Sequence, residues 1–232
     1  MNHAAATFAG SAASPSSFPR DGLPEVAFLG RSNVGKSSLL NALAGTRGLA
    51  LVSSAPGRTR VVNFFKLSGV PKPGGAGRGE LYLVDLPGYG YAKAPRQVRE
   101  GFERLAVSYL AGREPLRLCV FILDARHEPG EHDLQLREWL RHHGLRYVVA
   151  ANKIDALERG EARRREQALA RGIGCGAEAV VGVSAELGTG TRELWNLVRG
   201  AAFAPRAAAT DGGPGRERRP THDGRTVENH GR

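Results

Sequence analysis

Six short apolar runs recur along the chain, separated by longer segments of mixed polarity. Several of the runs lack polar alternation, which is typical of strands buried on both faces. They cover 25–29, 61–65, 80–84, 118–123, 146–150 and 179–183. Helical periodicity lies between them, at 36–44, 96–111, 131–142, 159–171 and 190–201. This alternation predicts an α/β fold in which helices cover both faces of a doubly wound, six-stranded sheet.

One connection between strands lacks a helix. The strands expected at 60–67 and 80–85 are separated by residues 68–79, which are rich in Gly and Pro. This composition predicts an antiparallel hairpin with a flexible tip. We therefore expect a mostly parallel sheet with one antiparallel strand.

The two ends of the chain differ in composition from its middle. Residues 1–22 are expected to form a partly flexible segment, within which residues 7–9 are a candidate short strand. Residues 23–201 carry all the periodic pattern and are expected to form one domain. Residues 202–232 are polar and rich in Gly, Pro and Arg, which predicts a disordered tail.

Composition narrows the classes of protein that fit. The 232 residues hold 33 Lys and Arg against 23 Asp and Glu, a net charge of +10 that favours polyanionic partners. Abundant Arg, Ala and Gly also follow from a GC-rich genome, which weakens the charge as a sign of nucleic-acid binding. Two cysteines exclude a disulfide scaffold. No run is long enough to span a membrane and the N-terminus lacks a secretory signal pattern, so we expect a cytoplasmic protein with no membrane partner.

A phosphate-binding motif follows the first predicted strand. Residues 30–37 read Gly-Arg-Ser-Asn-Val-Gly-Lys-Ser and match GxxxxGK[ST] between a strand and a helix. Backbone amides of such a loop bind phosphate oxygens. Lys36 is expected to reach the β and γ phosphates, and the hydroxyl of Ser37 to bind Mg²⁺.

Two further segments fit the γ-phosphate and the metal ion. Asp85-Leu-Pro-Gly88 ends a predicted strand, where the carboxylate would bind Mg²⁺ indirectly and the Gly88 N–H would meet the γ-phosphate. Thr59 lies in Pro56-Gly-Arg-Thr-Arg60, just before a strand, and is the candidate switch threonine that binds Mg²⁺ and the γ-phosphate. Alternatively, Thr59 is only an exposed turn residue.

A base-recognition motif follows the strand at 146–151. In Asn152-Lys-Ile-Asp155, the Asp155 carboxylate can accept hydrogen bonds from both N1–H and N2–H₂ of guanine. Asn152 and Lys153 are expected to brace the loop and cover the base, and the backbone of Ala185 to complete the pocket. These motifs in this order predict GTP rather than ATP.

The strings that carry these motifs resemble one known family. Gly-Arg-Ser-Asn-Val-Gly-Lys-Ser-Ser (30–38), Pro-Gly-Arg-Thr (56–59) and Asp-Leu-Pro-Gly-Tyr-Gly-Tyr-Ala (85–92) are similar to those of EngB (YihA/YsxC) GTPases, of the Era/TrmE-like translation group. The resemblance covers about residues 6–201. It implies a bacterial GTPase with a Ras-like P-loop G domain that acts as a switch in large ribosomal subunit assembly and is required for normal cell division and septation. Asn152 is a departure, since many members carry Thr there, but both residues can brace the loop.

The motifs and the resemblance together define the expected site. The expected catalytic residues are Asn33, Lys36, Thr59 and Gly88, and the expected Mg²⁺ ligands are Ser37 and Thr59. The residues expected to bind GTP or GDP are Gly30, Arg31, Ser32, Asn33, Val34, Gly35, Lys36, Ser37, Gly57, Arg58, Thr59, Arg60, Val61, Asp85, Leu86, Pro87, Gly88, Asn152, Lys153, Ile154, Asp155, Val183, Ser184 and Ala185.

Tyr89 occupies the position where Ras-like enzymes carry the glutamine that orients the attacking water. A phenol does not suit that task, so we expect slow intrinsic hydrolysis. Related GTPases with the equivalent of Asn33 use it to bind K⁺, which makes K⁺ a candidate second cation here. The alternative is that Asn33 only stabilises the loop.

Basic residues flank both predicted switch segments: Arg58, Arg60, Lys93, Arg96, Arg99 and Arg104. They form either a plain solvated face or a surface for ribosomal RNA that responds to the bound nucleotide. The expected partners are GTP or GDP and the RNA and proteins of the large ribosomal subunit, and the protein is expected to be a monomer.

Three alternatives remain open from the sequence. One is a P-loop kinase acting on a small molecule, against which the guanine motif and the segment at 85–89 argue. Another is an RNA-binding or ribosome-binding module that uses GTP as a structural ligand with negligible turnover. The last is a sister translation GTPase, although neither a second G domain nor a KH-type GXXG loop is visible.

Overall fold

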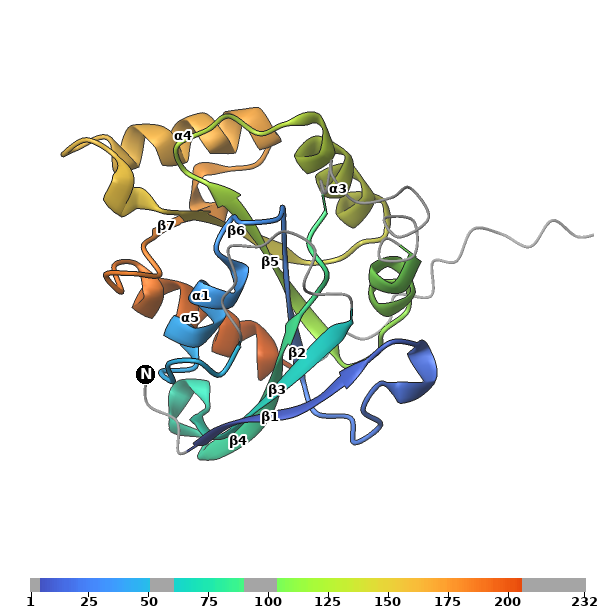
Figure 1. Cartoon of the computed structure of the whole chain (residues 1–232). Helices are drawn as coiled ribbons and strands as arrows, with labels where there is room; N and C mark the ends of the chain where they lie inside the picture. The colour runs from blue at the N-terminus through green and yellow to red at the C-terminus, as the bar shows by residue number, and fades with distance from the viewer. Residues whose placement is uncertain (1–4, 51–60, 90–103, 206–232) are drawn as a thin grey trace, which may run out of the picture.

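A single mixed sheet organises the protein. The computed structural model describes residues 5–50, 61–89 and 104–205. Across these residues the sheet has seven strands in the order β1-β3-β4-β2-β5-β6-β7 (Figure 1). Strand β3 is antiparallel to both of its neighbours, and the pairs from β4 across to β7 are parallel. The α/β fold, the mostly parallel sheet and the single antiparallel strand are confirmed.

The strands and helices follow the predicted runs closely. The strands are β1 (Ala5–Ala12), β2 (Glu25–Gly30), β3 (Val62–Pro71), β4 (Arg78–Asp85), β5 (Leu116–Asp124), β6 (Tyr147–Asn152) and β7 (Val180–Val183). The α-helices are α1 (Lys36–Leu43), α3 (Glu131–His142), α4 (Ala162–Ile173) and α5 (Thr191–Ala202), and residues 104–110 are also helical. Short 3₁₀ turns are η1 (Pro15–Ser17), η2 (Pro73–Gly75), η3 (Ile154–Ala156) and η4 (Ala177–Ala179).

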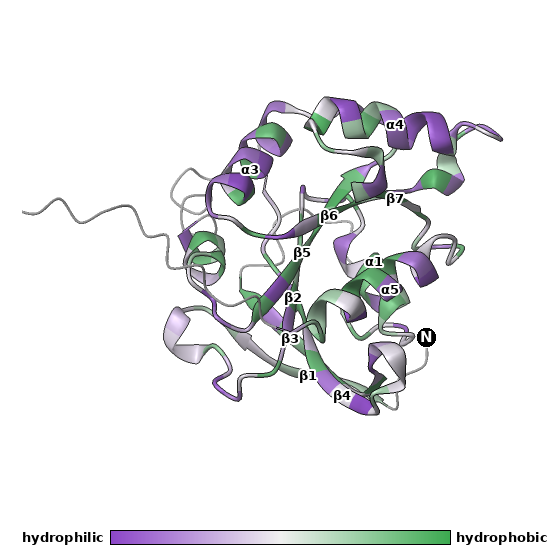
Figure 2. Cartoon of the chain, turned by 180° about the vertical axis from the view of Figure 1, so that it is seen from behind, coloured by the Kyte–Doolittle hydropathy of each residue, from purple (hydrophilic) through white to green (hydrophobic). Residues whose placement is uncertain are grey.

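Helices cover both faces of the sheet, as predicted. Leucines of α1 and the apolar stripe of α5 pack on one face, against residues such as Phe28 and Val120. Residues 104–110, α3 and α4 cover the other face (Figure 1). Figure 2 shows hydrophobic residues along the central strands and hydrophilic residues on the outer sides of α3 and α4. Each of these helices has one apolar side, which faces the sheet, and one polar side, which faces solvent, and this is why the sequence periodicity identified them.

The candidate short strand at residues 7–9 is confirmed and extends over residues 5–12, so the described sheet has seven strands and the expected number of six was wrong. β1 pairs antiparallel with β3, and its register shifts between Phe8 and Gly10. Its residues, Ala-Ala-Thr-Phe-Ala-Gly-Ser-Ala, are mostly small and exposed, so they show neither a continuous apolar run nor a clear alternation. An edge strand held mainly by backbone hydrogen bonds leaves little trace in the hydrophobic pattern.

The tip of the β3–β4 hairpin is shorter than the predicted 68–79. β3 continues to Pro71 and β4 begins at Arg78, and a hydrogen bond of 2.9 Å joins the Lys72 amide to the Gly77 carbonyl. The guanidinium of Arg78 also donates to the carbonyl of Gly69 at 2.7 Å. Backbone pairing therefore extends through a segment whose Gly and Pro content predicted a loop. Among the described residues, no helix is long and apolar enough to cross a membrane.

Candidate nucleotide-binding site

Strand register brings the predicted motifs to one edge of the sheet. Phe28 lies opposite Asp85, Gly30 opposite Ile122, and Asp124 opposite Asn152, which in turn lies opposite Val183. The carboxyl ends of the parallel strands therefore form a continuous row. In open α/β sheets this edge is where ligands bind.

The loop from β2 to α1 requires glycine at two positions. Gly30 has φ +157°, and a Cβ there would lie 2.7 Å from the carbonyl oxygen of Ile122. Gly35 has φ +95°, and its Cβ would collide with the side chain of Asn152. Asn33 also has a positive φ, of 63°, a conformation that Asn tolerates better than most residues. These constraints fix the curvature of the loop that contains Arg31, Ser32 and Val34, and α1 begins directly after it at Lys36 and Ser37.

A buried lysine and a buried carboxylate face each other beneath this loop. The Nζ of Lys36 donates to the carbonyl of Gly30 at 3.4 Å. Burial lowers the pKa of Lys36, and the nearby charge of Asp85 partly offsets this effect. Burial raises the pKa of Asp85 to about 6, although the positive charge of Lys36 and a hydrogen bond from Ser37 oppose the rise. Gly88 lies against the same ammonium, since a Cβ on Gly88 would be 2.8 Å from Lys36 Nζ.

Asp85 has the properties expected of a carboxylate that binds a cation. Among the described residues, its Oδ1 is buried without a hydrogen-bond partner. A buried carboxylate oxygen without a partner is costly, and a nearby divalent cation would remove that cost. Asp85 together with the Ser37 hydroxyl therefore suits Mg²⁺, a hard cation that prefers oxygen ligands and keeps several waters.

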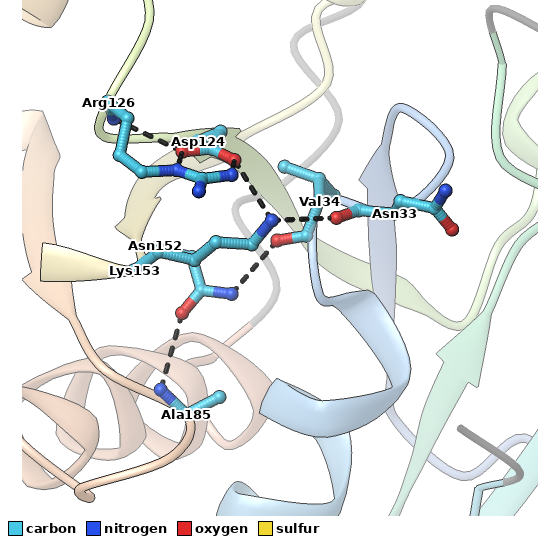
Figure 3. Close-up of polar contacts among 7 residues, drawn as sticks. All are labelled: Asn33, Val34, Asp124, Arg126, Asn152, Lys153 and Ala185. Atoms are coloured by element: carbon cyan, nitrogen blue, oxygen red, sulfur yellow. Dashed lines mark hydrogen bonds and ion pairs between the residues drawn. The ribbon is translucent and has the colours of Figure 1, made fainter. Parts of the chain in front are cut away.

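The Asn152 side chain joins three segments of the site. Its Nδ2 donates to the carbonyl of Val34 at 2.9 Å, and its Oδ1 accepts from the amide of Ala185 at 3.3 Å (Figure 3). The loop after β2, the end of β6 and the loop after β7 are thus tied together. The Ala185 amide, predicted to face the base, donates to Asn152 in this structure. The adjoining Ser184 is fully buried, and its hydroxyl accepts from the amide of Leu187 at 3.0 Å.

Lys153 makes a second connection to the phosphate-binding loop. Its φ is +68°, and its Nζ donates to the carbonyl of Asn33 at 2.9 Å. The same Nζ lies 2.9 Å from the Oδ2 of Asp124, at the end of β5 (Figure 3). Arg126 donates to both oxygens of Asp124, at 2.8 and 2.7 Å. The hydrogen bonds from Arg126 and Lys153 hold the pKa of Asp124 well below its usual range, against the effect of burial.

Sequence reasoning missed Asp124 and Arg126. The contact of Asp124 with Lys153 spans 29 residues, and no local motif announces it. One signal was present: Asp124 is the polar residue that ends a strongly apolar strand, where side chains reach the carboxyl edge of the sheet.

Two cavities flank the Lys153 side chain. One, of about 630 Å³, is lined by residues of α1, the base-recognition motif and the loop after β7, among them Gly35, Asp155 and Ala185. Asp155 therefore faces a space that suits a nucleobase, and Ile154 and Asp155 belong to the short turn η3. The other cavity, of about 290 Å³, lies between residues 31–34 and the segment after β5.

Part of the expected site lies outside the described residues. This applies to Gly57, Arg58, Thr59 and Arg60 of the first switch, and to Lys93, Arg96 and Arg99 after the second. Val61 is described and immediately precedes β3. Of the second switch, Leu86 is fully buried, and Pro87 lies between it and Gly88. The structure thus assembles the phosphate, base and Asp85 segments and leaves the position of Thr59 a prediction.

Comparison with known proteins gives one consistent family. Residues 25–153 match the family described as "50S ribosome-binding GTPase". A "Probable GTP-binding protein EngB" of Anaeromyxobacter sp. (strain K) is 46% identical over 207 residues, which are 89% of this chain and 95% of that protein. The protein of the same name from Solibacter usitatus is 44% identical over 85% of this chain and 96% of its own length.

Solved structures show the same fold. A crystal structure of a probable GTP-binding protein EngB aligns with a TM-score of 0.59 at 22% identity, covering 77% of this chain and 98% of that one. Era in complex with MgGDPNP and nucleotides of 16S ribosomal RNA aligns with a TM-score of 0.58 at 24% identity, covering 77% of this chain and 56% of that one.

Proposed function

The chain belongs to the EngB family of GTP-binding proteins and is a GTPase, and from this premise we propose that it acts as a switch in large ribosomal subunit assembly. The observation that carries the nucleotide part is the convergence of Lys36, Asp85 and the Asn152–Asp155 loop on one edge of the sheet. A family described as ribosome-binding, together with a net charge of +10, supports the ribosomal part. The resemblance to EngB proteins adds to this proposal a requirement for normal cell division and septation.

In this proposal each group has a defined task. Backbone amides of residues 35–37 and the Lys36 ammonium bind the phosphates, and Asp155 accepts hydrogen bonds from the N–H groups of guanine. A bound Mg²⁺ would supply positive charge to the phosphates. Ser37 and Thr59 would hold the metal directly, and Asp85 would orient its waters. Gly88 would donate its N–H to the γ-phosphate, so that loss of this phosphate releases the segment after Asp85.

K⁺ is proposed as a second cation at Asn33. The Asn33 backbone carbonyl accepts from Lys153, whereas its carboxamide points away from the network around Asp124 (Figure 3). The carboxamide oxygen is thus left to bind a cation beside the phosphates. Such a cation would place positive charge where other GTPases use an arginine finger.

Cosedimentation tests the ribosomal proposal. The protein, acting as a monomer, should pellet with large subunits in the presence of a non-hydrolysable GTP analogue and less with GDP, and this binding should weaken as salt rises. Charge reversal of Arg96 and Arg99 together should reduce binding and leave GDP affinity unchanged. Charge reversal of Arg163 and Arg164 on α4, which follows the base motif instead of a switch, is the matched control.

Two results would count against parts of this proposal. Equal subunit binding with GDP and the GTP analogue would favour the alternative of a ribosome-binding module that uses GTP as a structural ligand. Binding that survives the double reversal at moderate salt would place the RNA surface elsewhere.

A further inference from the structure

Tyr89 follows Gly88, at the position where Ras-like enzymes carry a water-orienting glutamine, and the structure shows where its side chain goes instead. The phenol donates a hydrogen bond of 2.7 Å to Oδ1 of Asp133. Asp133 belongs to α3 and is only 3% exposed. The side chain of Tyr89 therefore contacts α3. This helix lies on the face of the sheet opposite α1 (Figure 1).

Asp133 is itself held in place. Its second oxygen, Oδ2, accepts from the amide of Gly130 at 2.8 Å, an arrangement that caps the first turn of α3. Both oxygens of this buried carboxylate are thus occupied. Burial and the charge of Asp133 raise the pKa of Tyr89 well above its usual value, so the phenol stays protonated and remains a donor.

The backbone of Tyr89 is fixed as well. Its carbonyl accepts from the amide of Ser32, in the phosphate-binding loop, at 3.1 Å. Arg31 and Tyr89 form an isolated parallel bridge. On the other side of Gly88, the amide of Leu86 donates to the carbonyl of Phe28 at 3.3 Å. Residues 86–89 are therefore anchored at both ends, to β2 and to the loop that follows it.

Gly88 lies between these anchors and directly against the Lys36 ammonium. In the proposed function, on which this inference rests, Gly88 and Lys36 meet the same γ-phosphate. Fixed donors stabilise developing charge better than donors that must reorganise during the reaction. We propose that Tyr89 is a positioning residue: its hydrogen bond to Asp133 holds Gly88 at the phosphate-binding loop, so that the Gly88 N–H is set in advance for the γ-phosphate.

The test is Tyr89→Phe, which removes only the phenol oxygen. Wild-type turnover is measured first, so that absence of hydrolysis, which would overturn the GTPase function itself, is separated from failure of this proposal. In the variant, affinity for a non-hydrolysable GTP analogue and the single-turnover rate should each fall about five- to tenfold, the loss expected for one buried hydrogen bond. GDP affinity should stay within about twofold, because GDP has no γ-phosphate.

Tyr82→Phe is the matched control. The Tyr82 phenol also donates to an aspartate, Oδ2 of Asp21, at 2.8 Å, but Tyr82 lies opposite Glu25 at the start of β2, three residues before Asp85 in β4. The same loss of a tyrosine–aspartate hydrogen bond there should leave the ratio of analogue to GDP affinity unchanged. If Tyr82→Phe and Tyr89→Phe lower this ratio equally, a general structural effect explains the result and the proposal fails.

A double-mutant cycle identifies the partner. Asp133→Asn retains one acceptor oxygen, for which the Tyr89 phenol and the Gly130 amide must compete. The effect of Tyr89→Phe should therefore be smaller in the Asp133→Asn background than in the wild type. An undiminished effect would show that Asp133 is not the partner that matters. A Tyr89→Phe protein that binds the GTP analogue more tightly than wild type would also overturn the proposal, since the contact would then oppose the GTP state.

Discussion

Buried charge lies at both ends of the sheet, but the two clusters are satisfied in different ways. At the start of β2, Glu25 is 1% exposed and accepts from the Tyr109 phenol at 2.7 Å and from Arg113 Nε at 2.9 Å. Arg113 also donates to the carbonyl of Pro19 at 2.6 Å and lies over the ring of Phe18. This cluster joins the N-terminal segment to β2 and to the segment after residues 104–110.

The carboxyl end of the sheet has a buried carboxylate of a different kind. Asp85 is 3% exposed, yet its Oδ1 has no partner within the described part of the chain. Burial raises its pKa, whereas the paired Asp124 nearby has a lowered pKa. The Glu25 cluster satisfies its polar atoms internally, whereas Asp85 Oδ1 is left without a partner in the described residues, as expected if the proposed site binds a cation there.

The largest effect on stability is expected from a substitution that disrupts the cluster around Glu25. Glu25→Ala removes the carboxylate and leaves the partly buried Arg113 guanidinium and the buried Tyr109 phenol without it. Loss of one partner from a buried ion pair costs about 3–5 kcal/mol of unfolding free energy, and because Arg113 keeps some contact with water we expect about 3 kcal/mol here. Urea denaturation measures this loss, and guanine-nucleotide affinity of the folded fraction should be unchanged.

The control for this prediction is an exposed pair. Lys66 Nζ lies 2.8 Å from Glu80, and their side chains are 32% and 41% exposed. Glu80→Ala should lower the free energy of unfolding far less than Glu25→Ala, because exposed ion pairs contribute little to stability. Comparable losses for the two variants would show that the Glu25 cluster is not a buried anchor.

The second prediction concerns Asp85 and pH. Because the folded protein raises the pKa of Asp85 to about 6, the folded state holds this proton where the unfolded chain has released it. The free energy of unfolding should therefore fall as pH rises from about 4 to about 6, by up to about 3 kcal/mol.

Asp85→Asn carries no titrating group and should lose this part of the pH dependence. Thermal or urea unfolding at pH 4, 5, 6 and 7.5 in the absence of nucleotide and Mg²⁺ measures the difference between the two proteins. In the wild type, Mg²⁺-dependent nucleotide affinity should also weaken below about pH 6, where Asp85 becomes protonated. Parallel stability profiles for wild type and variant would contradict the prediction.

The same contrast explains what the sequence could predict. The phosphate loop and the base motif are contiguous strings, each placed after a strand, so local pattern was sufficient to propose Lys36, Asp85 and Asp155 as site residues. Asp133 contacts Tyr89, which lies 44 positions away in the sequence, and Asp124 contacts Lys153, which lies 29 positions away. Only the folded chain brings these pairs together. β1 was missed in the strand count because its small, exposed residues carry little hydrophobic signal. The periodicity of apolar residues reports which positions are buried. The contacts of Asp133 and Asp124 and the pairing of β1 depend instead on hydrogen bonds between distant segments, which periodicity does not report.

A third prediction sharpens the assignment of the base pocket. Asp155→Asn should lower GTP affinity at least about tenfold, since each mismatched buried polar group costs about 1–3 kcal/mol. The carboxamide supplies a donor that suits the 2-oxo group of xanthine, so affinity for XTP should rise. Competition binding with non-hydrolysable analogues of GTP and XTP measures both changes, and unchanged affinity for the GTP analogue would remove Asp155 from the pocket. The free energy of unfolding without nucleotide should hardly change, because Asp155 is exposed and, unlike Glu25, belongs to the ligand-facing end of the sheet.

The smallest expected effect concerns Asn33, whose carboxamide is another polar group of the ligand-facing end that points away from the protein network (Figure 3). Tyr89 is bonded to Asp133 and does not orient water, so additional stabilisation of the transition state must come from an ion or a partner. A fully engaged positive group beside the phosphates is worth about 10³–10⁵ in rate, and only part of this should appear without the ribosome. We expect K⁺ to raise single-turnover hydrolysis about tenfold over Na⁺ at equal ionic strength. The Asn33→Ala variant should hydrolyse GTP equally fast in K⁺ and Na⁺ and should bind GDP nearly as well as the wild type. Equal wild-type rates in the two salts, measured alone and with large subunits, would mean that Asn33 only stabilises the loop.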